Sequence, residues 1–578
     1  MKIVVAKTAG FCMGVRRAVE LALDAPSQQR QPIYTYGPLI HNPQVLGMFV
    51  ERGVTVLEEI PAKASGTVLV RAHGVPPETK QQLKDAGFTV IDATCPKVVK
   101  VQSIIKSHAR KNFSVIIVGD QDHPEVVSLL GFAGEKGCVV GSLAALQALP
   151  AFEQAIVVAQ TTQNQILYQQ VKAWAAECRS HYKVFDTICD STERRQTEVR
   201  RLAQEVDAVV VVGGKNSGNT RRLAEIVREA GKPAFHIETE AELDGNALRP
   251  LQSVGITAGA STPTWIIKRV VRALEQIPSH RRYGIRSLLP RLMRLALLTN
   301  LYVALGAGCL CYAAMHLQRL PTSWPAVGVA MLYVLSMHIL NHLTSRAEDR
   351  YNDPDRERFY RQQKIVLTVM ALSAGALGLV VAFQFGALPF WTLLVMSLLG
   401  LSYNVRLLPA GVCPTCRFRR IRDLPGSKTI LIALAWGVVT AGLPALSASG
   451  GQWGVGALAV FWASATAFSR TAFFDLLDIQ GDRIVGKETI PILLGAERGL
   501  ILLKIVLAAL LVVLLAAGWS GIFSALAFVL TICPICLWAI IGRHEQRGML
   551  AGMQLEFMVE SLFVLTGLLT FVWLLAAF

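Results

Sequence analysis

Three cysteines occur in similar surroundings in the first third of the chain. Cys12 follows the apolar run IVVA, Cys95 ends the stretch TVIDATC, and Cys189 follows KVFDTI. A segment with helical spacing follows each cysteine, so all three thiols are expected in loops between a strand and a helix. Separations of 83 and 94 residues exclude a local zinc knuckle, whose ligands come in close pairs. They suit one cysteine from each of three similar lobes, holding a cubane iron–sulfur cluster with one iron left open for a substrate.

A second set of polar residues lies in loops that follow short apolar runs. Its members are His41, His73, His123, Glu125, Thr161, Thr162, Ser217, Asn219 and Ser261. Imidazoles, hydroxyls and the backbone amides at helix starts are donors that suit a diphosphate, and helix dipoles add to the attraction. For each residue alone a helix cap is the simpler interpretation, but their occurrence in equivalent loops favours an anion site beside the cluster.

The elements that must position these residues follow one repeated pattern. A short apolar strand leads to a polar loop and then to an amphipathic helix, as in SVIIV before His123 and AVVVV before GGKNSGNT. Strands that alternate with helices predict an α/β fold with mainly parallel sheets. In such sheets, ligands bind beyond the carboxyl ends of the strands.

Length and composition indicate more than one domain. Of the 578 residues, those before about position 290 include many charged side chains, whereas long apolar runs follow. We expect domains at residues 1–280 and 291–578, joined by a basic linker at 281–290. The 11 thinly spread cysteines and the absence of an N-terminal secretory signal predict free thiols or metal ligands in a cytosolic first half. The net charge of +16 lies largely in loops beside apolar spans, so nucleic-acid binding is not expected.

A series of short motifs runs through the first 275 residues: GFCMGVRRAV, IHNPQV, RAHGVP, DATCPKV, DHPEV, AQTT, DTICDSTERRQ, KNSGNT and TAGAS. In this order they resemble the 4-hydroxy-3-methylbut-2-enyl diphosphate reductase family. The resemblance implies a three-lobed α/β fold around a [4Fe-4S] cluster on Cys12, Cys95 and Cys189. It also implies a diphosphate site, with Thr161 or Thr162 near the substrate's hydroxyl end. The residues implied for the diphosphate are His41, His73, His123, Ser217, Asn219 and Ser261, with Gly218 where some relatives carry a second serine.

The family's chemistry is a reductive dehydroxylation. The open iron acts as a Lewis acid on the allylic hydroxyl, and Glu125 is the candidate proton source that lets the oxygen leave as water. Simple charge compensation at a helix start is the alternative role for Glu125. The products are isopentenyl and dimethylallyl diphosphate. No ferredoxin-like or flavin module is recognisable in the sequence, so an external electron donor such as ferredoxin or flavodoxin is expected.

The second half reads as an all-α membrane domain with nine apolar spans. They lie near 293–315, 325–344, 365–385, 387–404, 428–448, 454–474, 497–518, 521–542 and 555–577. Most approach the roughly 20 residues needed to cross a bilayer. Basic residues gather in the loops after spans two and four, so these loops, like the first domain, are expected in the cytosol and the C-terminus outside. This predicts a multi-pass protein of the inner membrane.

Acidic and amide side chains near those cytosolic loops could hold Mg²⁺ against a prenyl diphosphate. Asp475, Asp478 and Asp482 are expected just after the end of span six, and Asn341, Asp349 and Asp353 after span two. With DLLDIQGDRIVGKET, the nine spans resemble the UbiA family of intramembrane prenyltransferases over about residues 288–578.

The first aspartate motif departs from that family. His342 and Ser345 replace two of its aspartates, which leaves Asn341 and Asp349 and makes Asp353 a candidate replacement. The second motif matches the family, including Lys487 and Thr489, and further candidate diphosphate contacts are Tyr403, Arg406 and Lys428.

Two Cys-x-x-Cys pairs also occur in this half. Cys413 and Cys416 are a candidate metal or redox pair, whereas Cys533 and Cys536 are expected to be small apolar residues that fill space within span eight.

Three hypotheses follow. The first is a bifunctional enzyme, a reductase joined to a prenyltransferase that acts on a polyprenyl diphosphate with an aromatic or lipid acceptor. The second keeps the reductase but makes the membrane half a non-catalytic anchor or lipid-binding module. The third is a membrane iron–sulfur redox sensor or electron carrier, which would require a fourth protein ligand to the cluster.

Overall fold

The chain divides into two compact units. The computed structural model describes residues 1–277, 285–344, 351–403, 426–448, 453–485, 487, 489–547 and 552–577. The N-terminal unit is Met1–His280 and the C-terminal unit is Arg281–Phe578. The linker expected at 281–290 is helical from Ile285, where α12 (Ile285–Leu298) begins, because its leucines recur at helical spacing.

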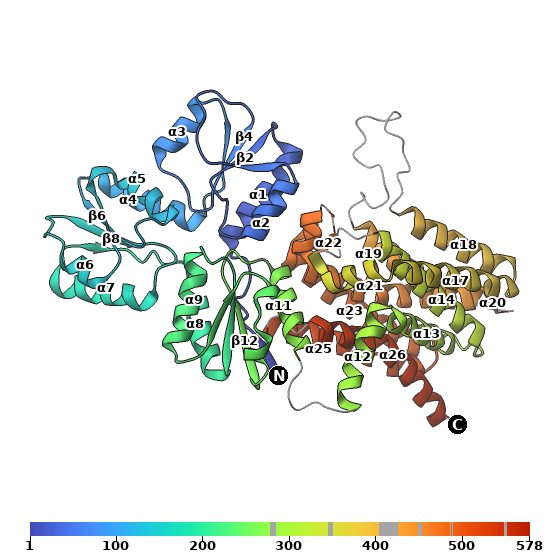
Figure 1. Ribbon diagram of the computed structural model, residues 1–578. Helices are drawn as coiled ribbons and strands as arrows, with labels where there is room; N and C mark the ends of the chain where they lie inside the picture. The colour runs from blue at the N-terminus through green and yellow to red at the C-terminus, as the bar shows by residue number, and fades with distance from the viewer. Residues whose placement is uncertain are drawn as a thin grey trace. The chain divides into compact units, whose positions relative to one another are not determined.

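The N-terminal unit consists of three lobes, each built on a four-stranded sheet (Figure 1). The strand orders are β1-β12-β10-β11, β3-β2-β4-β5 and β7-β6-β8-β9, and every neighbouring pair is parallel. The three-lobed α/β prediction is therefore confirmed. The strands are β1 (Lys2–Val5), β2 (Ile33–Tyr36), β3 (Val54–Leu57), β4 (Thr67–Val70), β5 (Thr89–Asp92), β6 (Ser114–Val118), β7 (Gly137–Val140), β8 (Ala155–Ala159), β9 (Lys183–Val184), β10 (Ala208–Val212), β11 (Ala234–Ile237) and β12 (Ser253–Ala258).

Helices enclose these sheets because the central strands are apolar on both faces. All residues of β4, β8 and β10 are buried, as expected for Val- and Ile-rich strands of a parallel sheet. The helices are α1 (Met13–Gln28), α2 (Pro43–Glu51), α3 (Pro77–Asp85), α4 (Pro96–Ala109), α5 (Pro124–Ala133), α6 (Leu143–Gln147), α7 (Gln165–Cys178), α8 (Asp190–Glu205), α9 (Gly218–Glu229), α10 (Gly245–Leu248) and α11 (Thr264–Gln276).

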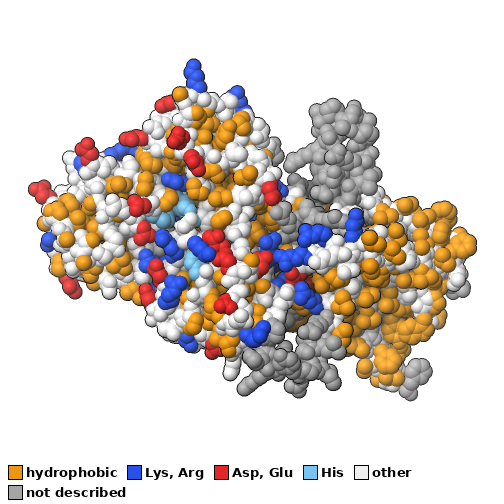
Figure 2. Space-filling view, viewed as in Figure 1, with side chains coloured by type: hydrophobic (Ala, Val, Ile, Leu, Met, Phe, Trp, Pro, Cys, Tyr) orange, Lys and Arg blue, Asp and Glu red, His pale blue; other side chains and the backbone are white. Residues whose placement is uncertain are grey.

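The described part of the C-terminal unit is helical. Its helices after α12 are α13 (Leu301–Leu317), α14 (Trp324–Thr344), α16 (Pro354–Gln362), α17 (Lys364–Gln384), α18 (Ala387–Ser402), α19 (Ser427–Gly437), α20 (Leu443–Ser447), α21 (Trp453–Val485), α22 (Ile490–Leu494), α23 (Ala496–Trp519), α24 (Leu526–Leu530), α25 (Ile532–Arg547) and α26 (Gly552–Ala577). Hydrophobic side chains dominate its visible surface (Figure 2), and Ile365 of α17 is 79% exposed. Such a surface is stable in lipid and unfavourable in water.

The expected count of nine spans is not reproduced by the described helices. Seven of them are long and apolar enough to cross a membrane. The first expected span is a pair of helices bent by 76°, and the break falls at Asn300, whose φ of 58° is left-handed. The fourth, α18, has 16 residues and is shorter than the hydrocarbon core requires. A membrane-embedded helical unit is nevertheless clear.

Candidate active site

The three sheets present their residues to one cavity by a common rule. In each sheet one of the two edge strands leads to a cysteine: β1 to Cys12, β5 to Cys95 and β9 to Cys189. Each central strand leads to one of the polar loops that the sequence singled out. All the predicted residues of the N-terminal unit line this cavity, whose empty volume is about 750 Å³ counting its open mouth: Cys12, Cys95, Cys189, His41, His73, His123, Glu125, Thr161, Thr162, Ser217, Gly218, Asn219 and Ser261.

The three thiols suit a metal cluster better than a single ion. All three are free, and each directly precedes a helix, α1, α4 or α8. Among the described residues, the group of three potential metal-ligand atoms close enough to share one ion, all within 4.8 Å of one another, comes from His41, His73 and His123. The three cysteine sulfurs do not form such a close group. Burial raises the pKa of Cys95, and negative charge on Cys12 and Cys189 raises it further. Three thiolates around one cavity would need a positive partner, and iron is a metal that binds such ligands.

Close packing holds Cys95 against the first turn of α1. A Cβ atom on Gly14 would lie 2.4 Å from Cys95 Sγ, closer than any real contact allows. We expect Gly14→Ala to displace the thiol, to lower the iron and sulfide content, and to destabilise the chain by about 1–3 kcal/mol. Iron and sulfide analysis with thermal unfolding measures both effects. The control is Gly47→Ala in α2, where nothing lies within 4 Å; equal cluster content in the two variants would contradict the prediction.

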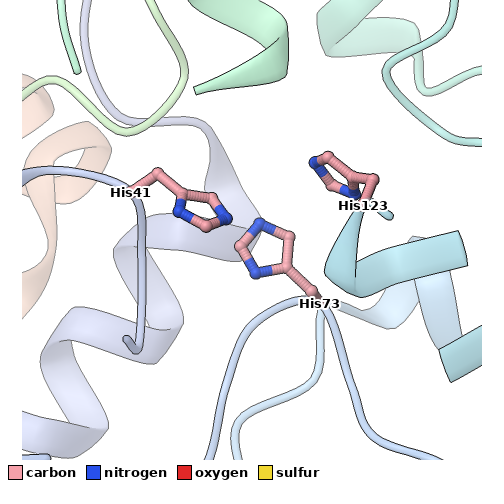
Figure 3. Close-up of side chains that lie close together, drawn as sticks. All are labelled: His41, His73 and His123. Atoms are coloured by element: carbon pink, nitrogen blue, oxygen red, sulfur yellow. The ribbon is translucent and has the colours of Figure 1, made fainter. Parts of the chain in front are cut away.

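Three histidines from two lobes converge on the same cavity (Figure 3). The ring centroids of His41 and His73 are 4.8 Å apart, and that of His123 lies 5.4 Å from His73. His41 Nε2 and His73 Nδ1 are buried without a hydrogen-bond partner. His123 Nδ1 accepts the Glu125 N–H at 3.1 Å, which leaves its Nε2 to carry the proton of the neutral ring. The site thus offers unpaired polar nitrogens to a ligand.

The charges around the histidines favour an anion over a metal cation. Burial lowers the pKa of His41, and the Arg71 and Arg221 cations lower it further. Burial also lowers the pKa of His123 to about 4. Both arginines were missed by the sequence analysis, although Arg71 begins the quoted motif RAHGVP and Arg221 follows KNSGNT.

The third lobe completes this polar end of the cavity. Asn219 Nδ2 is buried and has no hydrogen-bond partner, Ser217 caps α9, and Ser261 Oγ donates to the His41 carbonyl oxygen at 3.1 Å. At Gly218 a Cβ would make ordinary contacts of 3.5 Å and 3.6 Å with the His123 ring, so crowding does not exclude a side chain there. A Cβ on Gly214 would lie 2.6 Å from the His41 carbonyl oxygen, so the Gly-Gly pair permits close approach of two lobes.

Glu125 lies in the first turn of α5, two residues after His123. Its carboxyl group is buried, with the residue 2% exposed. Oε1 accepts the Thr161 N–H at 2.7 Å and Oε2 accepts the Thr161 hydroxyl at 2.8 Å. Burial raises the pKa of Glu125 to about 7, against the opposing effect of these hydrogen bonds. Thr162 instead accepts from Gln160 Nε2 at 3.0 Å, so of the two threonines Thr161 is the one joined to Glu125.

In the C-terminal unit the aspartates lie within a helix rather than after one. Asp475, Asp478 and Asp482 follow the apolar run of span six in sequence, but α21 continues without a break to Val485 and includes all three. Hydropathy marks where the apolar run ends, whereas the helix extends well beyond it. The spacing of three and four residues places the carboxylates on one face.

The second aspartate motif is closely packed with partners. Asp475 accepts the Thr429 hydroxyl at 2.5 Å, and Lys428 Nζ lies 4.0 Å from its other oxygen. Asp482 Oδ1 accepts from Asn352 Nδ2 at 2.8 Å and lies 3.7 Å from Lys487 Nζ, while Asp482 Oδ2 is buried without a hydrogen-bond partner.

The first motif is only partly described. Asn341 and His342 lie in the last turns of α14, and Asp353 caps α16 by accepting the Arg356 N–H at 3.1 Å. Asn352, which the sequence analysis missed, contacts Asp482 instead, and a Cβ on Gly481 would fall 1.7 Å from its oxygen. Tyr403 directly follows α18, and Cys533 is buried. Of the residues singled out in the sequence of this half, five lie outside the described residues: Ser345, Asp349, Arg406, Cys413 and Cys416.

Comparison with known proteins decides the family of the N-terminal unit. The family model described as LytB protein matches residues 3–275. The chain is 42% identical over 280 residues to a 4-hydroxy-3-methylbut-2-enyl diphosphate reductase of Pelobacter propionicus, which covers 48% of this chain and 99% of that relative. The chain belongs to the LytB family. A reductase of Aquifex aeolicus is also 42% identical, over 278 residues that cover 48% of this chain and 96% of the relative.

The remainder of this LytB-family chain is a UbiA prenyltransferase domain. The model of the UbiA prenyltransferase family matches residues 300–548. A UbiA homolog from Archaeoglobus fulgidus, solved bound to GPP and Mg²⁺, aligns at 17% identity and a TM-score of 0.35 over 48% of this chain and 98% of that one. The two family models, at residues 3–275 and 300–548, confirm the fusion predicted from the two groups of motifs.

Proposed function

We propose that the LytB domain reduces 4-hydroxy-3-methylbut-2-enyl diphosphate to isopentenyl and dimethylallyl diphosphate, and that the UbiA domain transfers prenyl groups within a membrane. The observation that carries the first activity is the single cavity that brings three thiols, a buried acid and an anion site together. A [4Fe-4S] cluster on the three thiols would supply electrons and a Lewis-acid centre at the hydroxyl end of the substrate.

The chain's own residues bind the diphosphate at the other end. His41, His73 and Asn219 contribute unpaired buried atoms, and the N-terminus of α9 adds backbone N–H groups. Arg71 and Arg221 supply positive charge without lying on the reacting atoms. This arrangement fixes one end of a small allylic diphosphate, so that its hydroxyl faces the thiols and Glu125.

Glu125 holds the proton that the leaving oxygen requires. With its pKa near 7, the buried carboxyl group is protonated in a large fraction of molecules at neutral pH. In the ionised form Oε2 accepts the Thr161 hydroxyl. When Oε2 carries the proton this hydrogen bond reverses, so that the Thr161 hydroxyl accepts the proton from Oε2 while it donates its own to the substrate oxygen. Reduction also consumes two electrons, which an external donor such as ferredoxin or flavodoxin supplies, and a second proton, which adds to the allylic carbon skeleton once the oxygen has left as water.

The UbiA domain is proposed to bind Mg²⁺ and a prenyl diphosphate at the Asp475–Asp482 face of α21. The free, buried oxygen of Asp482 supports a cation there. We place this domain in the inner membrane, with the LytB domain in the cytoplasm and the C-terminus outside, on the basis of the basic loops. A polyprenyl diphosphate and an aromatic or lipid acceptor are the proposed substrates.

Replacing Asp482 tests the membrane activity. We expect Asp482→Asn to lower Mg²⁺-dependent prenyl transfer by roughly 10- to 100-fold, because the amide keeps the shape and loses the charge that holds the cation. Glu497→Gln, an exposed carboxylate at the start of α23, is the matched control. Transfer in vesicles containing each full-length variant is the measurement, and unchanged transfer in Asp482→Asn would exclude this magnesium site.

Turnover by the intact chain tests the reductase activity. Full-length protein purified anaerobically in detergent is expected to convert 4-hydroxy-3-methylbut-2-enyl diphosphate to both five-carbon products with a chemically reduced dye as donor. Absence of both products from protein that contains a complete cluster would reject the proposed reaction.

A further inference from the structure

One buried cation in the LytB domain has no part in the chemistry described above. Arg195 lies on α8, six positions after Cys189, and is 3% exposed. Its Nη1 donates to the Ala258 carbonyl oxygen at 3.0 Å, and its Nη2 donates to the Gly10 carbonyl oxygen at 2.7 Å. Gly10 stands two positions before Cys12. The guanidinium therefore joins the helix that follows one cysteine to the loop that precedes another.

The hydrogen bonds of Arg195 leave its charge uncompensated. Both of its acceptors are neutral carbonyl groups, and its buried Nε has no hydrogen-bond partner. Among the described residues, no carboxylate oxygen forms an ion pair with it within 4.0 Å. An isolated buried charge is costly, and in folded proteins it is normally paired. A negative group is therefore expected nearby.

The thiols are the groups placed to provide that negative charge. Burial lowers the pKa of Arg195, and negative charge on Cys12, Glu198 and Cys189 raises it in return. Glu198 contributes a negative charge of its own, with its oxygens held by the backbone N–H groups of Lys7 at 2.7 Å and Thr8 at 2.8 Å, but that charge is the same with and without a cluster. The two cysteines remain as the partners that gain charge when a cluster is bound.

We propose that Arg195 is a positioning residue whose fixed positive charge, held beside Cys12 and Cys189, stabilises the reduced state of the cluster that these thiols hold. Reduction adds negative charge to a cluster already surrounded by thiolates, and net charge and burial are among the factors that set such potentials. A cation held in a dry site by two carbonyl groups acts more strongly than one in water. This inference rests on the proposed function only in requiring that a cluster occupies the thiols.

The test compares two substitutions of Arg195 in anaerobically prepared full-length protein. Arg195→Met removes the charge and keeps an extended apolar side chain, whereas Arg195→Lys keeps the charge. We expect Arg195→Met to lower the equilibrium constant for one-electron reduction about tenfold, a midpoint potential about 59 mV more negative. Arg195→Lys is expected to restore most of that shift. Arg201→Met, which removes an exposed charge from the same helix, is the control and should shift the potential little.

Each outcome decides the assignment. An unchanged potential in Arg195→Met, or equal shifts in Arg195→Met and Arg195→Lys, would show that the charge is not what matters and would overturn the proposal. If Arg195→Met binds no cluster while Arg195→Lys does, the iron content of the two variants supports the requirement for a positive charge. If both variants lack the cluster, the proposal is overturned. Wild-type protein without iron and sulfide would instead reject the proposed function itself.

Discussion

Glu125→Gln is expected to lower the turnover of the reductase by about 10²- to 10⁴-fold while leaving substrate binding nearly unchanged. The amide fits the same space beside Thr161, but it has no acidic proton to pass on. The carboxyl group contacts Thr161 and not the histidines of the diphosphate site, so KM should stay within a few-fold of wild type. Single-turnover and steady-state rates with a reduced dye measure the two quantities separately.

The raised pKa of Glu125 predicts that kcat/KM of the reductase depends on pH. Burial raises the pKa of Glu125 to about 7, so its acid form predominates below that pH and is lost above it. For the wild-type protein, kcat/KM should therefore fall about tenfold per pH unit on the alkaline side, and Glu125→Gln should lack this limb.

The matched control is Glu78→Gln. Glu78 occupies the same position in α3 that Glu125 has in α5, directly after a helix-starting proline, but it is exposed. Its replacement should leave turnover unchanged. A Glu125→Gln protein that turns over normally would remove Glu125 from proton transfer and leave it the role of a helix-start charge.

Cys95→Ser is expected to abolish the cluster and with it the reductase activity, by at least about 100-fold. A hydroxyl is a much poorer ligand for iron in such a cluster than a thiolate. Among the described residues that line the cavity, the other sulfurs belong to Cys12 and Cys189, which are already assigned as ligands. Iron and sulfide per chain, together with the visible absorption of the anaerobic protein, measure the loss.

Cys138→Ser serves as the control for Cys95→Ser. Cys138 is also a free, partly buried thiol, but it lies on β7 and donates to the Val115 carbonyl oxygen at 3.6 Å. Its replacement should leave cluster content and turnover intact. Full iron content in Cys95→Ser would contradict the three-thiol site.

The order of strands and helices in the N-terminal unit could be predicted because short stretches of sequence determine it. Each run such as AVVVV is short, apolar and followed by a polar loop, so strand, loop and helix could be assigned without knowing the tertiary structure. The meeting of Cys12, Cys95 and Cys189 followed from their equivalent places in those repeats. What the sequence did not reveal is that cysteines follow the edge strands and the polar loops follow the central ones.

The arginines around the cavity could not be recognised in advance. Arg195 lies in the stretch STERRQTEVRR, where four arginines look alike, and only packing against Gly10 and Ala258 singles it out. Arg71 and Arg221 likewise read as loop or helix charges until the lobes come together. In the UbiA domain, Asn352 reaches Asp482 across 130 positions, a contact that no local pattern predicts.

The most direct test of the account is spectroscopy of the anaerobically purified full-length protein before and after addition of 4-hydroxy-3-methylbut-2-enyl diphosphate. We expect a cluster with four irons per chain whose signal changes on addition of this substrate, because one iron lacks a protein ligand. Protein without iron and sulfide, or a cluster whose signal ignores the substrate, would contradict the proposed chemistry at the three thiols.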